Sequence, residues 1–317
     1  SSDVCSSDLS MVIINQERWK KSKEAVLSNI YSTTDNISVA PFAYQKNIPM
    51  YFSESFELND TIKKEFKRLG LEKLYIIGGD SSINKFVEES INKMGIKTER
   101  IYGKHSFETS IKLATRLTEL TDVKEIAVAN DGEGVPNGVA MASPASKNNI
   151  PIIMMNKKDT NALLKFINEN NIEKVYVIGN EEQFSKDFMK KMPNSKRIIG
   201  KNRYETDIMI IKEFYDLEKV KNVYMTKGGK DNNTDFINTL CLSTIAAKED
   251  KPIVFNDASM PKEVKEFLKD NNIKEFTEVG FKLVRPRLIN PTTTRVFTCL
   301  LIIVIWIVGI KRVISFH

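Results

Sequence analysis

The chain has 317 residues, of which 41% are hydrophobic, which is enough for two or three small domains with buried cores. Its formal net charge is +6, a mild basic excess that permits anionic partners without choosing among them. Two histidines and three widely spaced cysteines make a zinc site, a disulfide framework or a His-based catalytic triad improbable. We therefore expect no metal and no cofactor.

The chain opens on a polar, low-complexity stretch, SSDVCSSDLS, which we expect to be a non-native leader (1–10). No basic segment followed by an apolar core stands after Met11, so the pattern of a signal peptide is not predicted there.

Three kinds of segment recur about every hundred residues. The apolar strands LYIIGG, VYVIGN and FTEVGF start at residues 74, 175 and 276, 101 residues apart. A second set of strands is led by Pro49, Pro151 and Pro252, at the strand position where a missing N–H costs least. Helical segments at 59–73, 159–174 and 260–275 lie between the two sets. This period exceeds that of solenoid repeats, so each copy is predicted to be a small domain.

The second copy displays the pattern most fully. Expected helices and apolar strands alternate along it, in the order helix 108–120, strand 125–130, helix 138–148, strand 151–155, helix 160–170, strand 174–179, helix 182–192 and short strand 196–200. Strands that are apolar throughout and alternate with helices predict an α/β fold with a parallel sheet covered on both faces.

The outer copies depart from this pattern. Arg18 to Pro41 spans 23 residues, whereas the matching interval from Arg203 to Thr244 spans 41, so the first copy is expected to lack a strand and its loop. The third copy stays in register to about Phe281 and is expected to be truncated there, with a tail foreign to the fold. The predicted domains are 11–98 (shortened), 99–196 and 197–281 (truncated), followed by a tail at 282–317.

The tail carries an apolar run at residues 296–310. Fifteen residues of helix span roughly 22 Å, short of a hydrocarbon core of about 30 Å. A membrane anchor, a buried strand or helix, and a segment that is not native to the chain all stay open.

One phrase is read as a module start in each copy: IINQERWKKS (13–22), IYGKHSFETS (101–110) and IIGKNRYETD (198–207). Asn202 and Glu205 fit a helix capping box. Arg203 in the first helical turn opposes the helix dipole, which predicts a carboxylate of a neighbouring module or a polyanion beside it. The aligned aromatics Trp19, Phe107 and Tyr204 are expected to pack under the helix start, with a sugar-stacking platform as the alternative.

The phrases GKNRYETD and GKHSFETS, with the VYVIGN, LYIIGG and proline-led strands, resemble the cell-wall-binding repeat type 2 family over roughly residues 13–281. That family is known from surface-layer and cell wall proteins of clostridia. The resemblance implies three Rossmann- or Toprim-like modules in a pseudo-threefold arrangement. It also implies an extracellular, wall-located, non-covalent anchor that binds an anionic, teichoic-acid-like polysaccharide, with other surface-layer proteins as further partners.

The candidate polymer-binding residues belong to the repeated motifs: Arg18, Lys104, Lys201, Arg203, Pro49, Pro151 and Pro252. For the prolines, marking the start of a strand is the ordinary interpretation. Three weak sites on one chain gain by multivalency, and binding by charge is expected to be salt-sensitive.

Other functions remain as alternatives. A structural module of a surface lattice would use protein–protein contacts. A nucleotide- or metal-dependent enzyme would use the loops GGDSS (78–82) or TKGGK (226–230), or Asp131 and Glu133, but none of these is a complete phosphate-binding motif. No RNA- or DNA-binding signature is present, so nucleic acid is not an expected partner. A membrane is a partner only if residues 296–310 are an anchor.

Overall fold

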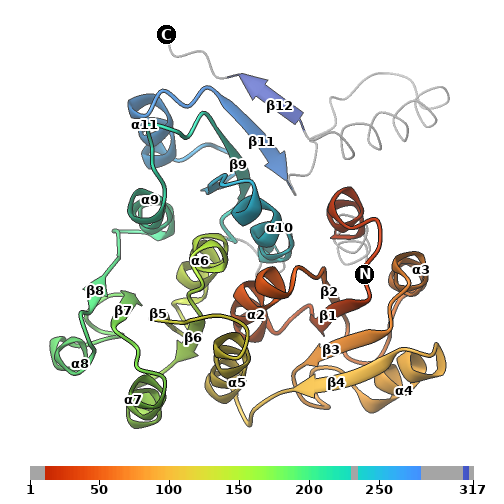
Figure 1. Ribbon diagram of the computed structural model, residues 1–317. Helices are drawn as coiled ribbons and strands as arrows, with labels where there is room; N and C mark the ends of the chain where they lie inside the picture. Colours follow the sequence, from red (N-terminus) through yellow and green to blue (C-terminus); the bar gives the residue numbers. More distant parts are fainter. Residues whose placement is uncertain (1–10, 230–234, 280–309, 314–317) are drawn as a thin grey trace.

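The computed structural model describes residues 11–229, 235–279 and 310–313. Within these ranges the chain forms three α/β units arranged around a common centre (Figure 1). The predicted class, three tandem modules with parallel sheets, is confirmed.

The first repeat opens with a helix at residues 11–18 and continues through seven further elements. These are β1 (Glu24–Asn29), α2 (Thr33–Lys46), β2 (Met50–Ser53), α3 (Asp60–Leu69), β3 (Lys73–Ile77), α4 (Lys85–Lys93) and β4 (Lys97–Ile101). The second repeat consists of α5 (Ser106–Thr118), β5 (Glu125–Asn130), α6 (Val135–Lys147), β6 (Ile152–Met155), the short 3-10 helix η1 (Lys157–Asp159), α7 (Thr160–Glu169), β7 (Lys174–Ile178), α8 (Lys186–Lys191) and β8 (Lys196–Arg197).

The third repeat follows the same plan. Its described elements are α9 (Arg203–Phe214), β9 (Asn222–Lys227), α10 (Phe236–Lys248), β10 (Ile253–Asn256), α11 (Lys262–Asp270), β11 (Glu275–Val279) and β12 (Ile310–Val313). Because β4 and β8 pair with β3 and β7, they close the first and second sheets. The sheets thus extend slightly past the predicted boundaries at 98 and 196.

All three sheets share one strand order: β2-β1-β3-β4, β6-β5-β7-β8 and β10-β9-β11-β12. The expectation that the first repeat lacks a strand is therefore wrong, because β1 stands where β5 and β9 stand. The first repeat is shorter for other reasons. The described part of its first helix has 8 residues against 13 in α5, and residues 30–32 alone connect β1 to α2, whereas 228–235 connect β9 to α10.

The last strand corrects a second expectation. Ile310–Val313 pairs antiparallel with β11, so a segment of the predicted foreign tail completes the third sheet. The apolar run at 296–309 lies outside the described residues. Among the residues that are described, no helix is long and apolar enough to span a membrane.

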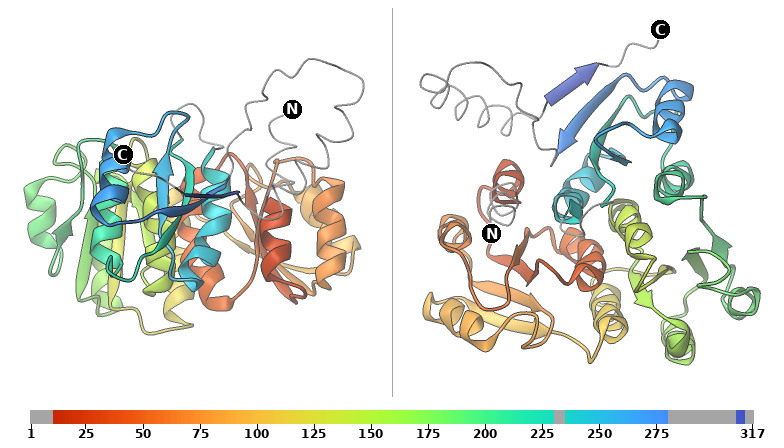
Figure 2. Two further views of the ribbon diagram at one scale, coloured as in Figure 1. Left: turned by 90° about the horizontal axis from the view of Figure 1, so that it is seen from above. Right: turned by 180° about the vertical axis from the view of Figure 1, so that it is seen from behind.

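The helices α2, α6 and α10 pack against one another at the centre of the molecule, as Figures 1 and 2 show from three sides. Nearly all of α10 is buried, since it contacts its own sheet and both neighbouring helices. A helix that is buried all round needs apolar or small residues on every face. This explains why these three helices lack the two-sided pattern of the surface helix α3.

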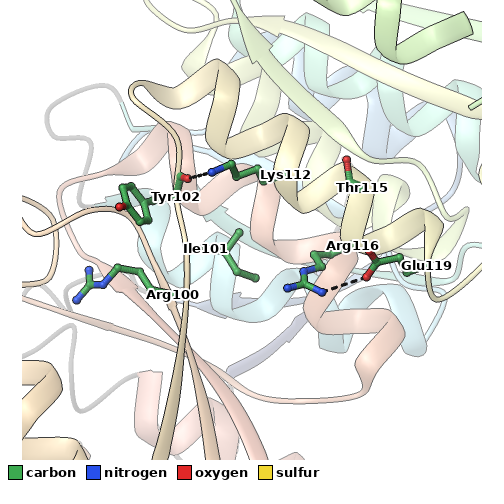
Figure 3. A pocket seen from close by; sticks show the side chains of 7 residues that line it. All are labelled: Arg100, Ile101, Tyr102, Lys112, Thr115, Arg116 and Glu119. Carbon is green, nitrogen blue, oxygen red and sulfur yellow. Dashed lines mark hydrogen bonds and ion pairs between the residues drawn. The ribbon is translucent and has the colours of Figure 1, made fainter. Parts of the chain in front are cut away.

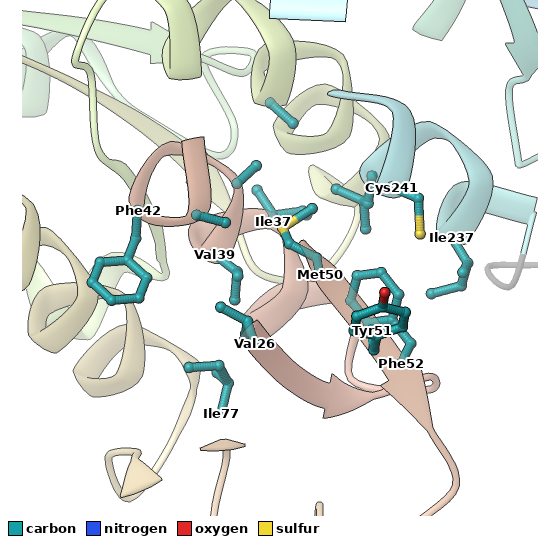
Figure 4. Packing of buried hydrophobic residues seen from close by; sticks show 14 of the residues in the cluster. Val26, Ile37, Val39, Phe42, Met50, Tyr51, Phe52, Ile77, Ile237 and Cys241 are labelled. Atoms are coloured by element: carbon teal, nitrogen blue, oxygen red, sulfur yellow. The ribbon is translucent and has the colours of Figure 1, made fainter. Parts of the chain in front are cut away.

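Each central helix also touches the edge strand of another repeat: α2 lies on β6, α6 on β10 and α10 on β2. Ser38 of α2 donates to the carbonyl of Ile152 in β6 across 2.9 Å. Figure 4 shows Ile237 and Cys241 of α10 beside Tyr51 and Phe52 of β2. One hydrophobic cluster therefore runs through all three repeats, and this cyclic packing produces the pseudo-threefold arrangement.

Candidate functional site

The repeated phrase forms a hydrogen-bonded turn at the start of α9. Gly200 N donates to Thr206 Oγ1 at 3.0 Å, and Lys201 N donates to Glu205 Oε2 at 2.6 Å. Asn202 caps the helix by accepting from Glu205 N at 3.0 Å. One of the two hydrogen bonds of the predicted capping box is thus present. In place of the other, the Glu205 carboxylate accepts from Lys201 N instead of from Asn202 N.

The start of α5 repeats this turn. Gly103 N donates to Thr109 Oγ1 at 3.0 Å, and Lys104 N donates to Glu108 Oε2 at 2.8 Å. A Cβ at Gly103 would lie only 2.1 Å from the Cβ of Glu108, so no larger residue fits there. The Gly, Glu and Thr of the phrase are therefore held by backbone geometry and helix capping, which explains their recurrence without a ligand.

The lysine of the phrase has a different position. Only the backbone N–H of Lys104 and of Lys201 enters the turn, and both side chains are exposed. They are available to a soluble polymer at the start of α5 and of α9.

Arg203 is half-buried, and its Nη1 donates to the carbonyl of Gly228 at 2.7 Å, directly after β9 of the same repeat. The partner in this bond is a carbonyl within the repeat, whereas the expected partners were a carboxylate of a neighbouring module or a polyanion. Tyr204 lies beside it, and its hydroxyl donates to Asp257 Oδ2 at 3.2 Å. This places Arg203 and Tyr204 at the carboxyl edge of the third sheet.

Arg18 lies elsewhere, because the first copy of the phrase was read in the wrong register. Phe52 N donates to Met11 Sδ at 3.0 Å, just as Phe255 N donates to Asp207 Oδ2 at 2.7 Å. The two phenylalanines each follow their proline by three residues, so Met11 occupies the place of Asp207. Arg18 then corresponds to Phe214, at the end of the helix.

The contacts of Arg18 agree with that position. Its Nη2 donates to Asn47 Oδ1 at 3.4 Å, and its guanidinium lies 5.4 Å from the ring centroid of Trp19. Asn47 precedes β2, so Arg18 lies at the amino edge of the first sheet. The structure does not bring it together with Arg203, which lies at the carboxyl edge of a sheet.

The three prolines are buried directly before β2, β6 and β10. Their carbonyls accept from Val26 N, Ala127 N and Tyr224 N at 2.9, 3.0 and 2.9 Å. The burial favours a role at the start of the strand over contact with a polymer.

A pocket lies where β4 leads into α5 (Figure 3). Its lining residues are Arg100, Ile101, Tyr102, Lys112, Thr115, Arg116 and Glu119. Arg100 Nη2 donates to Glu88 Oε2 at 2.6 Å, and Arg116 Nη2 donates to Glu99 Oε1 at 2.5 Å. Lys112 Nζ donates to the carbonyl of Tyr102 at 2.6 Å and lies 5.5 Å from its ring centroid.

Sequence reasoning missed this pocket. Tyr102 belongs to the phrase at 101–110, but Lys112 and Arg116 are polar residues of an amphipathic helix and nothing in their spacing indicates a site. Only the pairing of β4 with the first sheet brings Arg100 and Tyr102 beside α5.

The alternative enzyme site gains little from the geometry. Asp131 Oδ2 accepts from Asn156 Nδ2 at 3.3 Å, at the end of β5 and β6. Over the described ranges, no group of three or more His, Cys, Asp or Glu side chains could hold a metal ion.

Three α/β modules around shared central helices, with basic side chains where one module passes into the next, define a protein built from repeated binding modules. The model of the family described as Cell wall binding domain 2 (CWB2) matches residues 100–189 and 197–316, and the chain belongs to this family. The second match continues through the segment that had been predicted to be a foreign tail. Family membership indicates a location at the cell wall.

Two proteins of Bacillus subtilis (strain 168) are similar in sequence. N-acetylmuramoyl-L-alanine amidase LytC is 26% identical over 85% of this chain and 52% of its own length. The amidase enhancer is 26% identical over 84% of this chain and 36% of its own length. The chain thus spans about half of the length of LytC and about a third of the length of the amidase enhancer.

Two solved structures from Clostridium difficile share the fold. Cwp8 superposes with a TM-score of 0.78 at 27% identity, over 86% of this chain and 47% of that one. Cwp6 gives 0.75 at 25% identity, over 84% and 42%. The implied relationship to clostridial wall proteins is confirmed.

Proposed function

We propose that the chain anchors a protein non-covalently to the cell wall by binding an anionic, teichoic-acid-like polysaccharide. The observation that carries the proposal is the exposed lysine in the equivalent turns of two modules, Lys104 at the start of α5 and Lys201 at the start of α9. Beside the first turn, Lys112 adds a positive charge to the β4–α5 pocket, whose arginines are already paired with glutamates.

The polymer contacts that we propose centre on Lys104, Lys201 and Lys112. Each is a point charge that can meet a phosphate without a fixed geometry. Arg203 adds positive charge beside the second turn, although its Nη1 is already engaged by Gly228. Because the two turns belong to different modules, one long polymer can engage both, and the weak contacts reinforce each other.

We further propose that this part of the chain binds without catalysing a reaction. The phosphate-loop candidates are incomplete, and the family is described by binding. A shift in melting temperature with nucleotide or divalent metal would contradict this part of the proposal.

The test is sedimentation of the full chain with isolated walls, either intact or stripped of anionic polymer. We expect binding to intact walls and strong loss on stripped ones. Equal binding to both would favour a protein–protein role in a surface lattice. The double variant Lys104→Gln/Lys201→Gln should bind intact walls more weakly. The control Lys165→Gln/Lys186→Gln removes the same charge from α7 and α8, where both lysines are exposed, and should bind like the unchanged protein.

A further inference from the structure

Three large aromatic side chains are exposed on one edge of the first repeat. The exposed fraction of the residue is 59% for Tyr31, 76% for Phe56 and 73% for Phe86. Tyr31 follows β1, Phe56 follows β2, and Phe86 stands in the first turn of α4, after β3. All three therefore lie at the carboxyl edge of the sheet, where parallel α/β folds place their ligands. We call these residues the aromatic edge.

The loops that carry the aromatic edge are tied to one another. Asn29 Nδ2 donates to Ser55 Oγ at 2.9 Å and to the carbonyl of Ser82 at 2.7 Å. Asn84 N donates to the carbonyl of Ser55 at 2.8 Å. Hydrogen bonds thus connect the turns that carry the three rings, and this order lowers the conformational entropy that is lost when a ligand binds.

The fold does not need aromatic residues at these places, because the other repeats build it without them. Phe56 lies seven residues after Pro49, and the same count from Pro151 and Pro252 reaches Lys158 and Ser259. Phe86 is second after the cap of its helix, where α8 has Asp187. Tyr31 is second after β1, where the residues after β5 and β9 are Gly132 and Gly229. Exposed apolar surface that the fold does not require marks a binding site.

The polar groups around the aromatic edge indicate what it binds. Glu54, Glu57 and Asp80 are exposed on the same loops, and Tyr31 OH donates to Glu54 Oε1 at 3.4 Å. Lys85 is paired with Asp80 at 3.3 Å. This acidic setting repels the phosphates that we assign to the basic pocket. It suits uncharged sugar rings, whose C–H faces lie on aromatic rings while their hydroxyls donate to carboxylates.

We propose that the aromatic edge binds uncharged sugar rings of the wall glycan by stacking. This inference rests on the proposed wall-binding function and assigns it a second component, which differs from the first by being insensitive to salt. Charge contacts between exposed groups weaken as salt rises, whereas stacking does not.

The test uses the full chain and walls that have been treated with protease and stripped of anionic polymer, at about 0.1 M and about 1 M salt. The variant Phe56→Ser/Phe86→Asp installs the residues of the other repeats. We expect the unchanged chain to keep residual binding at high salt and the variant to lose it by about tenfold. The control Leu120→Ser/Met209→Ser removes exposed apolar side chains from the other repeats and should bind like the unchanged chain.

Equal residual binding by variant and unchanged chain at high salt would overturn the proposal. So would a difference seen on untreated walls that disappears after protease treatment, since a protein partner would then occupy the aromatic edge. The single variant Phe56→Ser is the control for a folding defect in the double variant. Its melting temperature should be unchanged while its residual binding at high salt falls. If only the proposal of sugar stacking on the aromatic edge fails, the salt-dependent binding to intact walls remains. If only the proposal of charge-based binding fails, the salt-dependent binding is absent while the residual binding at high salt remains.

Discussion

Lys248 Nζ donates to Asn47 Oδ1 across 3.3 Å, which joins the end of the third central helix to the residue after the first. The same contact recurs between the other modules, from Gln45 Nε2 to Asn149 Oδ1 and from Lys147 Nζ to Asp250 Oδ1. The three acceptors share a left-handed backbone, with φ of 54°, 57° and 52°, which asparagine and aspartate tolerate. The contacts form a closed ring at the amino edges of the sheets.

The contact between Lys248 and Asn47 contributes little stability, because both residues are exposed. Lys248→Met should lower the free energy of unfolding by less than about 1 kcal/mol, measured by urea denaturation. The modules should still unfold together, since one hydrophobic cluster runs through all three. A first repeat that melts separately in this variant would contradict the account.

The contact between α2 and α6 should be far less tolerant. A Cβ at Gly138 of α6 would lie 3.0 Å from Ile37 Cδ1 and 3.1 Å from Met154 Sδ. Gly138→Val should therefore destabilise the protein by about 1–3 kcal/mol through overpacking. Thermal unfolding checks this. An unchanged melting temperature would mean that the central helices are less tightly packed than described.

The motif residues divide into two groups with separable effects. Thr206→Val removes the acceptor of Gly200 N and should cost about 1–2 kcal/mol of stability. Lys201→Gln keeps the backbone N–H and should leave stability unchanged while weakening wall binding. If Lys201→Gln lowers the melting temperature as much as Thr206→Val does, the lysine is structural and the assignment to polymer contact fails.

The contact between α2 of the first module and α5 of the second should respond to pH through Asp35 of α2. Burial raises the pKa of Asp35 to about 6, although a hydrogen bond from Thr109 opposes the shift. The folded protein thus holds an extra proton between about pH 4 and about pH 6, so stability falls as pH rises through this window and the full penalty applies above it. Asp35→Asn should add about 1–3 kcal/mol at neutral pH and flatten the profile. A variant with the parent's slope over this window would refute the assignment.

The sequence alone predicted the triplication, because three markers recur in register and parallel strands need apolar residues on both faces. It failed where one alignment had to be chosen without geometry. Arg18 and Arg203 share a residue type, yet the equivalent contacts of Met11 and Asp207 show that Arg18 ends its helix. The strand β1 was missed because that alignment left no room for it.

The candidate site was harder to predict than the fold. Tyr31, Phe56 and Phe86 are separated in the chain and meet only because β1, β2 and β3 end at one edge. The prolines, by contrast, stand out in the sequence by their regular spacing. Because all three are buried, that spacing is better explained by their place at the start of a strand than by contact with a ligand.

The salt dependence of wall binding tests the central claim most directly. The logarithm of the binding constant of the full chain for intact walls should fall linearly with the logarithm of the salt concentration, as counterions are released from a polyanion. Lys104→Gln/Lys201→Gln should reduce that slope by about 1–2, roughly one for each lost contact. A binding constant that is the same at low and high salt, or a slope that both substitutions leave unchanged, would contradict the account.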